Sequence, residues 1–177
     1  MKITMFGLAG TGTSTCAKLL AKELEYEFKS SGNMLRAVAK DHNMTIEEFD
    51  ALITRENDPK YDFELDDKVA KYGLENDDFV FESRLAWNFI PDSIKIKLEC
   101  DLETAYNRVS QREGISYDKA KGVTDKRARD VKMRYSQIYP DLVFPPENSI
   151  FDLVIETDVL TPEEIVLTIK NFLKSRN

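Results

Sequence analysis

Near its N-terminus the chain reads Gly7-Leu8-Ala9-Gly10-Thr11-Gly12-Thr13-Ser14, a loop with three glycines in six positions. Glycines let successive backbone N–H groups converge on an anion without obstruction by Cβ atoms. Apolar residues flank the loop at strand spacing before it and at helix spacing after it: Ile3, Met5 and Phe6, then Cys16, Ala17, Leu20, Ala21 and Leu24. The order strand, glycine loop, helix predicts a phosphate-binding loop, because the helix N-terminus adds its positive dipole end to the same site.

The loop follows the pattern G-x-x-x-x-G-K-[ST] except at one position, where Thr13 takes the place of the lysine. Ser14 keeps the hydroxyl that binds the metal ion in loops of this kind. An ordinary turn between a strand and a helix is the alternative, since glycine motifs also occur without a ligand. The rest of the chain has to decide between the two.

Length and charge limit the class of protein. The chain has 177 residues, a net charge of −7 and a pI near 4.9. This length fits one domain with small inserted segments. Its lysines and arginines are scattered, which argues against a nucleic-acid or anionic-membrane partner. Small anions remain possible ligands, because a local arginine cluster can override the global charge.

The cysteines, the histidine and the hydropathy indicate a reduced, cytoplasmic protein. Cys16 and Cys100 lack CxxC spacing and stand in apolar surroundings, so we expect core thiols rather than a disulfide or metal pair. No apolar run reaches membrane-spanning length, and no signal-peptide pattern is present. The only histidine, His42, has no metal partners nearby in the sequence, so neither a zinc site nor a Ser/His/Asp triad is expected.

A helical insertion is predicted over residues 33–72, between a short strand at 26–29 and a more apolar strand at 79–81. Its first helix begins near Asn33 and places Arg36 within the first turns. Arg36 either binds a second phosphate near the glycine loop or is a solvated helix charge.

The same insertion contains two further predicted helices. Thr45 and Glu48 form a capping box at the start of one. The other, over about 61–72, carries Asp62 and Asp66 one turn apart. Such a pair usually faces solvent, but it could also read the hydrogen-bonding edge of a bound base or ribose.

The apolar strand at 79–81 ends in Glu82-Ser83-Arg84. Ligands of open α/β sheets collect at the carboxyl ends of the strands, so Glu82 and Arg84 are expected to point toward the glycine loop. Arg84 would bind a phosphate in bidentate fashion, and Glu82 would hold a water of a Mg²⁺ ion. Trp87 is interpreted as core packing rather than as a ligand contact.

Arginines are frequent in the next part of the chain. After an alternating strand at 94–98, Asp101 is predicted to cap a helix that carries Arg108 and Arg112. A basic helical stretch follows, in which Arg127 and Arg134 are two turns apart and lie on one face, able to reach the same polyphosphate. The alternative is a solvated amphipathic helix, which a charge run alone would favour.

The C-terminal part supplies a fifth strand at 151–155 and a last helix. Thr161, Pro162 and Glu164 are the signals for the start of that helix: an N-cap, a proline in the first turn and the second half of a capping box.

Seven motifs, spread in order over almost the whole chain, together resemble the archaeal-type cytidylate kinases, a branch of the P-loop nucleoside monophosphate kinases. They are Gly7–Thr15, Ser31-Gly32 with Arg36, Glu82–Ala86, Arg112–Ser116, Arg134-Tyr135, Ile138-Tyr139 and Phe151–Thr157. The threonine at position 13 also resembles this branch.

The resemblance implies an α/β P-loop fold of three layers, in which a five-stranded parallel sheet is flanked by helices. Within a single kinase domain spanning 1–177, the core would comprise 1–32, 78–112 and 139–177. A monophosphate-binding insertion would span about 33–77, and a lid would span about 113–138.

The resemblance also implies roles for individual residues. Donor ATP phosphates would be held by Gly7, Gly10, Thr11, Gly12, Thr13, Ser14 and Thr15. The acceptor would be bound by Ser31, Gly32, Arg36 and Arg84; Asp62 and Asp66 are added from their spacing alone, as candidates to read its base. Catalysis would rest on Arg84, Arg127 and Arg134, while Arg108 or Arg112 would flank the adenine. Mg²⁺ would be held by Ser14 and, through water, by Glu82.

The predicted activity is ATP-dependent phosphorylation of CMP or dCMP by a monomeric enzyme whose partners are small nucleotides. Two alternatives stay open. The acceptor could be another monophosphate such as AMP or UMP, or the chain could be a nucleotide-binding sensor without turnover. The missing loop lysine leads us to expect that a lid arginine supplies its charge.

Overall fold

The computed structural model describes residues 1–56 and 58–176. All strand pairings are parallel, and the strand order is β2-β3-β1-β4-β5, which confirms the predicted five-stranded parallel sheet. The strands are β1 (Lys2–Gly7), β2 (Glu27–Ser30), β3 (Phe79–Glu82), β4 (Ile94–Glu99) and β5 (Leu153–Glu156).

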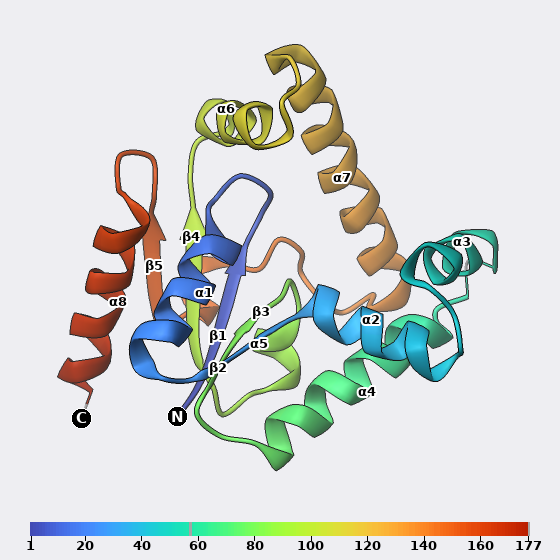
Figure 1. Cartoon of the computed structure of the whole chain (residues 1–177), viewed down its shortest axis with the longest axis horizontal. Helices are drawn as coiled ribbons and strands as arrows, with labels where there is room; N and C mark the ends of the chain where they lie inside the picture. The colour runs from blue at the N-terminus through green and yellow to red at the C-terminus, as the bar shows by residue number, and fades with distance from the viewer. Residues whose placement is uncertain (57, 177) are drawn as a thin grey trace.

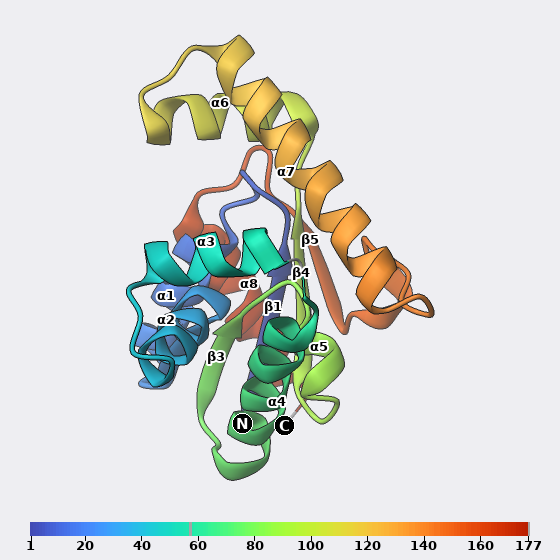
Figure 2. The ribbon, with the colours of Figure 1, turned by 90° about the vertical axis from the view of Figure 1, so that its right-hand side faces the viewer.

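Helices cover both faces of the sheet and so form the predicted three layers (Figures 1 and 2). Figure 2 shows α1 and α8 on one side, with α5 and α7 on the other. The helices are α1 (Thr13–Leu24), α2 (Ser31–Asp41), α3 (Ile46–Glu56), α4 (Lys60–Glu75), α5 (Ala86–Phe89), α6 (Leu102–Glu113), α7 (Tyr117–Ile138) and α8 (Pro162–Ser175), with a 3-10 turn at Asn148–Ile150.

The middle strand β1 packs against both helical layers. Ile3 and Met5 belong to the core that β1 shares with α1 and α8. Phe6 faces the other layer, where it contacts the rings of Phe144 and Phe151 at centroid distances of 6.0 and 5.6 Å. Because successive strand residues point to opposite faces, this alternation anchors β1 on both sides and fixes the position at which the glycine loop leaves it.

The last helix begins as predicted. The Thr161 N–H donates to Glu164 Oε2 at 2.8 Å, and the Glu164 N–H donates to Thr161 Oγ1 at 3.3 Å, which completes the capping box. Asp101 differs from the prediction. It stands at the N-cap of α6, but within the described chain its side chain accepts no cap hydrogen bond. Its N–H instead donates to Asp158 Oδ1 at 3.0 Å, which ties the start of α6 to the turn after β5.

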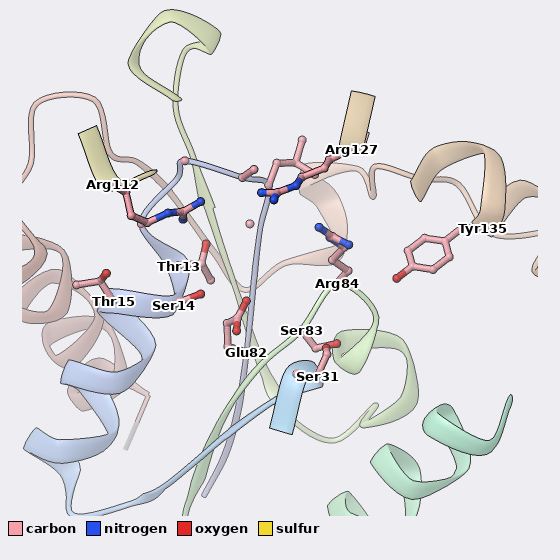
Figure 3. A pocket seen from close by; sticks show the side chains of 16 residues that line it. Thr13, Ser14, Thr15, Ser31, Glu82, Ser83, Arg84, Arg112, Arg127 and Tyr135 are labelled. Atoms are coloured by element: carbon pink, nitrogen blue, oxygen red, sulfur yellow. The ribbon is translucent and has the colours of Figure 1, made fainter. Parts of the chain in front are cut away.

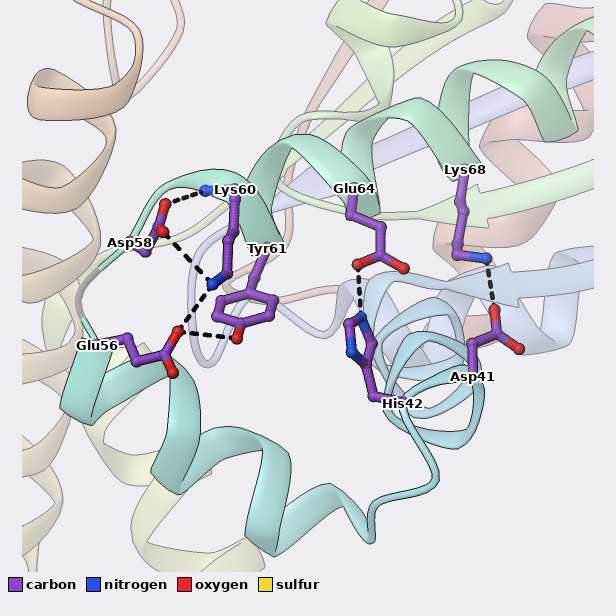
Figure 4. Close-up of polar contacts among 8 residues, drawn as sticks. All are labelled: Asp41, His42, Glu56, Asp58, Lys60, Tyr61, Glu64 and Lys68. Atoms are coloured by element: carbon purple, nitrogen blue, oxygen red, sulfur yellow. Dashed lines mark hydrogen bonds and ion pairs between the residues drawn. The ribbon is translucent and has the colours of Figure 1, made fainter.

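The segment between β2 and β3 has its own small core of Val38, Ala39, Phe49 and Tyr61. Figure 4 shows the polar contacts that join its helices. They are Lys68 Nζ to Asp41 Oδ2 at 2.7 Å, His42 Nε2 to Glu64 Oε2 at 2.8 Å, Lys60 Nζ to Glu56 Oε2 at 2.9 Å, and Tyr61 Oη to Glu56 Oε2 at 2.9 Å. The predicted capping box of α3 is present as well, with the Thr45 N–H donating to Glu48 Oε2 at 2.8 Å.

The first of these helices, α2, begins at Ser31 rather than near Asn33. Ser30, the last residue of β2, caps it: Ser30 Oγ accepts from the Asn33 N–H at 3.2 Å. The capping serine therefore starts the helix two residues early and carries β2 directly into α2.

Helix α7 is 22 residues long and occupies most of the predicted lid. It runs from the end of α6 toward the insertion helices (Figure 1). Both cysteines are free thiols, with Cys16 buried and Cys100 half-buried. Across residues 1–56 and 58–176, every helix is too short or too polar to cross a membrane.

Candidate active site

A cavity of about 310 Å³ opens where β1, β2 and β3 end (Figure 3). Parallel strands bring their carboxyl ends to one edge of the sheet, so residues distant in sequence meet there. The lining residues are Gly7, Leu8, Ala9, Gly10, Gly12, Thr13, Ser14, Thr15, Ser31, Gly32, Glu82, Ser83, Arg84, Arg112, Arg127 and Tyr135.

The glycine loop is braced by its own threonines. Thr11 Oγ1 donates to the Leu8 carbonyl at 2.8 Å and lies 2.7 Å from Thr13 Oγ1. Thr13, which stands where related loops have lysine, is only 5% exposed. Its hydroxyl is held inside the loop and supplies no positive charge, so cations for a bound phosphate have to come from elsewhere.

Arginines from three elements bring positive charge to this cavity. Arg84 follows β3, Arg112 lies near the end of α6 and Arg127 lies on α7, and all three line the cavity (Figure 3). Glu113 bridges two of them, with its Oε1 accepting from Arg112 Nη2 at 2.9 Å and from Arg127 Nη1 at 3.4 Å. Glu82 is the carboxylate among the lining residues, so the cavity is suited to a polyanion.

Ser14 and Glu82 lie together on the loop side of the cavity (Figure 3). Burial raises the pKa of the Glu82 carboxyl, while a hydrogen bond with Ser14 and the charges of Arg84 and Lys18 oppose that rise. One hydroxyl and one carboxylate fit Mg²⁺, which is usually bound by one or two carboxylates together with substrate phosphates and water. Among the described residues there is no group of three His, Cys, Asp or Glu that could hold a metal ion by itself.

The turn after β3 fixes Arg84. Ser83 Oγ accepts from the N–H groups of Leu85 and Ala86 at 3.1 and 3.2 Å. Trp87 donates its indole N–H to the Arg84 carbonyl at 2.9 Å and is 6% exposed. Trp87 is thus a core residue, as predicted, and it also holds the backbone that presents Arg84 to the cavity.

Tyr135 lines the cavity although sequence reasoning gave it no role. Its ring packs on Phe144 with centroids 5.0 Å apart, and its hydroxyl points toward Arg84 (Figure 3). Burial raises the pKa of the Tyr135 phenol, whereas the charge of Arg84 and a hydrogen bond with it act in the opposite direction. The signal that could have indicated such a residue was the position of Tyr135 directly after Arg134, within a motif already quoted for the family resemblance.

A second cavity, of about 400 Å³, adjoins the first and shares Gly10, Gly12, Thr15 and Arg112 with it. Its other walls are Thr11, Cys16, Arg108, Leu160, Pro162 and Ile165. Arg108 and Arg112, one or the other of which was expected beside an adenine, therefore line the same space, which combines apolar walls with guanidinium groups.

Arg108 also supports the loop from behind. Its Nη1 donates to the Gly10 carbonyl at 3.3 Å and to Thr157 Oγ1 at 3.0 Å, and its Nη2 donates to the Thr157 carbonyl at 2.5 Å. These bonds connect the glycine loop to the end of β5, whereas Arg112 is free of backbone partners of this kind among the described residues.

The residues expected to bind the acceptor fall into two groups. Ser31, Gly32 and Arg84 line the first cavity. Arg36 is exposed on α2, donates from Nη2 to Asn33 Oδ1 at 2.9 Å, and is not among the lining residues.

Asp62 and Asp66 lie outside the cavity lining but do not face solvent. Asp62 accepts from Arg134 Nε at 2.9 Å, and Asp66, 9% exposed, accepts from the Tyr139 hydroxyl. The interpretation as a solvated acidic pair is therefore wrong. Arg134 is held by Asp62 and does not share the cavity with Arg127, because two helical turns separate the side chains along α7.

Comparison with known proteins places this geometry in a family. The model of the cytidylate kinase-like family matches residues 2–159. The cytidylate kinase of Methanobrevibacter smithii is 36% identical over 174 residues, covering 98% of this chain and 99% of that one. The cytidylate kinase of Methanococcoides burtonii is 33% identical over 157 residues, covering 89% and 87%.

Solved structures agree on the fold. An uncharacterized protein from Eubacterium ventriosum superimposes with a TM-score of 0.73 at 21% identity, covering 99% of both chains. Shikimate kinase from Bacteroides thetaiotaomicron gives a TM-score of 0.66 at 14% identity, covering 98% of both. The solved structures show the fold alone, whereas the family model and the sequence relatives lead to one conclusion: this chain belongs to the cytidylate kinase-like family.

Proposed function

We propose that this chain transfers the γ-phosphoryl group of ATP to CMP or dCMP. The observation that carries the proposal is that one cavity joins two anion-binding regions. The glycine loop lies on one side, and Ser31, Gly32 and Arg84 lie on the other. A kinase needs donor and acceptor within one cavity, whereas a nucleotide sensor needs only the donor side. Membership of the family supports the same choice.

The donor phosphates would lie on the backbone N–H groups from Gly10 to Thr15, at the N-terminus of α1. Mg²⁺, when bound by Ser14 and through water by Glu82, would neutralise charge on the phosphate oxygens. Because Thr13 is bonded within the loop, Arg127 is our candidate for the charge that lysine supplies in related loops.

The donor base would occupy the second cavity. Leu160, Pro162 and Ile165 offer an apolar wall, and the planar guanidinium of Arg112 can stack on an aromatic ring. The Arg108 side chain would line the same cavity, while its guanidinium nitrogens donate to the Gly10 carbonyl and to Thr157 Oγ1.

The acceptor phosphate would be bound by Arg84, with Ser31 and Gly32 at the start of α2. Arg36 would reach it from the rim of the cavity. Asp66 is the candidate reader of the cytosine amino group, since its carboxyl group accepts one bond from Tyr139 and keeps further lone pairs. Asp62 is occupied by two nitrogens of Arg134 and is less suited to that task.

The proposed reaction requires little covalent chemistry from the protein. Phosphoryl transfer depends on alignment of donor and acceptor and on neutralisation of the equatorial oxygens. Arg84 and Arg127 lie near each other in the cavity lining (Figure 3), and both would act on the transferring phosphoryl group. The α7 helix would also exclude water, which otherwise competes with the acceptor for the phosphoryl group.

The test is ADP formation from ATP and Mg²⁺ with CMP, dCMP, UMP or AMP in turn, beside a reaction without acceptor. Stimulation by CMP and dCMP alone supports the proposal. Stimulation by AMP or UMP instead would assign the chain to another monophosphate. ADP formation that no monophosphate stimulates would overturn the acceptor assignment.

We further propose that the enzyme works as a monomer in the cytoplasm. The free thiols of Cys16 and Cys100 support a reduced compartment. Light scattering of the purified protein would test the monomer directly.

A further inference from the structure

Helix α7 carries two arginines on one face that have different partners. Arg127 lines the phosphate cavity, whereas Arg134, seven residues later, is bound to α4 of the insertion. Seven residues correspond to about 10 Å along the helix axis. One rigid element therefore spans both the donor side of the site and the segment that is proposed to receive the acceptor.

The ion pair between Arg134 and Asp62 is bidentate. Arg134 Nε donates to Asp62 Oδ1 at 2.9 Å, and Nη2 donates to Oδ2. The two side chains are only 28% and 19% exposed, so water screens the pair less than it screens a surface pair. A bidentate guanidinium–carboxylate pair fixes orientation as well as distance, because both groups are planar.

A second contact lies one helical turn further along α4. Asp66 Oδ2 accepts from the Tyr139 hydroxyl, and the Tyr139 ring meets the edge of Phe63 at a centroid distance of 6.1 Å. Two contacts separated by a turn fix both the position of α7 and its rotation about its own axis. The rotation decides where Arg127 points, since Arg127 is on the same helix.

We propose that Asp62 is a positioning residue: by holding Arg134 it sets the rotation of α7 and so places Arg127 at the phosphate cavity. This inference rests on the proposed function. It makes the insertion and α7 a single unit, so that movement of the acceptor-binding segment carries Arg127 with it. The role differs from direct contact with the acceptor base, and the two roles predict different kinetics.

A positioning role predicts an effect on turnover. Breaking the pair by Asp62→Asn is expected to lower kcat by about 100-fold, the cost of roughly 1 Å misplacement in an active site. KM for CMP and the preference for CMP over UMP are expected to stay the same. Arg134→Lys keeps the charge but loses the bidentate geometry. Its kcat is expected to lie between those of wild type and Asp62→Asn.

Reversal of the pair is the decisive variant. Asp62→Arg combined with Arg134→Asp restores the contact with its charges exchanged, and it is expected to recover most of the kcat that either single variant loses. Asp130→Asn is the matched control, because Asp130 forms an exposed ion pair with Lys126 at 2.6 Å on the same helix. That control should retain wild-type kcat.

The experiment measures kcat, KM for CMP and KM for ATP for wild type and these variants, with thermal unfolding of each. Loss of kcat that the exchanged pair restores supports the inference. A raised KM for CMP with no recovery by the exchanged pair would overturn it in favour of base reading. Wild-type kcat in folded Asp62→Asn would overturn it as well. Wild type without CMP-dependent ADP formation is a separate result, which counts against the proposed function.

Discussion

The backbone of Gly10 rests directly on Ala105 of α6: a Cβ at position 10 would lie 2.6 Å from the Cα of Ala105. Gly10 also has a φ of +89°, a backbone conformation that other residues rarely adopt. The glycine therefore serves two purposes. It lets the loop turn its N–H groups toward the cavity, and it lets α6 pack against the outside of the loop.

Gly10→Ala is expected to destabilise the protein and to weaken ATP binding together. Overpacking against α6 costs roughly 1–3 kcal/mol, and the left-handed backbone adds about 1–2 kcal/mol. Urea denaturation and ATP titration would measure the two effects. Gly122→Ala is the control, because a Cβ there meets open space on α7. It should stabilise by about 0.4–1 kcal/mol. A fully stable Gly10→Ala variant would contradict the described packing.

Arg127→Ala is expected to lower kcat strongly, while KM for ATP changes little. If Arg127 supplies the charge that Thr13 cannot, its loss should cost about 3–5 powers of ten in turnover. Arg129→Ala removes a neighbouring exposed charge from the same helix and should have little effect. A loss of about tenfold for Arg127→Ala would show that other groups neutralise the transferring phosphoryl.

Arg108 and Arg112 line the same cavity but should respond differently to truncation. Arg108→Ala removes the guanidinium donors of the Gly10 and Thr157 carbonyls, which then keep only the longer bonds from the Cys100 thiol and the Leu160 N–H. The loss is expected to cost on the order of 1–3 kcal/mol of stability. Arg112→Ala should raise KM for ATP with little change in the free energy of unfolding. Kinetics and urea denaturation of both variants would check this, and equal loss of stability in the two would contradict it.

The pH dependence of stability should reveal the raised pKa of the Asp66 carboxyl. Burial raises the pKa of its carboxyl from 3.8 to about 7, with Asp62 and Asp67 acting in the same direction. Between about pH 4 and pH 7 the folded state keeps this proton while the unfolded chain has lost it. The contribution of Asp66 to the free energy of unfolding therefore falls as pH rises through that window, by at most about 1.4 kcal/mol per pH unit.

Asp66→Asn removes this titration, and the amide oxygen can still accept from Tyr139. Relative to wild type, the variant should gain stability from pH 5 to pH 7, as measured by urea denaturation at both values. A constant difference between Asp66→Asn and wild type would mean that the Asp66 carboxyl titrates in the ordinary range.

The sequence predicted the sheet and most helices because their signals are local. Helix α1 spans Thr13–Leu24, as its apolar spacing indicates, and the Thr161 capping box starts α8. The structure differs from the prediction at the ends of elements, where a single side chain decides at which residue a helix or strand begins. Ser30 starts α2 two residues early, and Phe151 packs beside the sheet, so that β5 begins only at Leu153.

The site was predictable only in part. The glycine loop, Glu82 and Arg84 follow from strand ends that the topology brings together. The partner of Arg134 is 72 residues away in the sequence, and no local pattern indicates which carboxylate it meets. Tyr135 was missed for the same reason, since its position beside Arg84 depends on how α7 packs across the sheet.

The central claim is that the cavity couples ATP cleavage to the phosphorylation of CMP. Anion-exchange chromatography of a reaction of the purified protein with ATP, Mg²⁺ and CMP, together with an assay of inorganic phosphate, tests it most directly, because ADP, CDP and inorganic phosphate are then quantified separately. We predict that CDP and ADP appear in equal amounts without inorganic phosphate. Inorganic phosphate accumulating while CMP stays unchanged would contradict the account, since it would show that the cavity delivers the phosphoryl group to water.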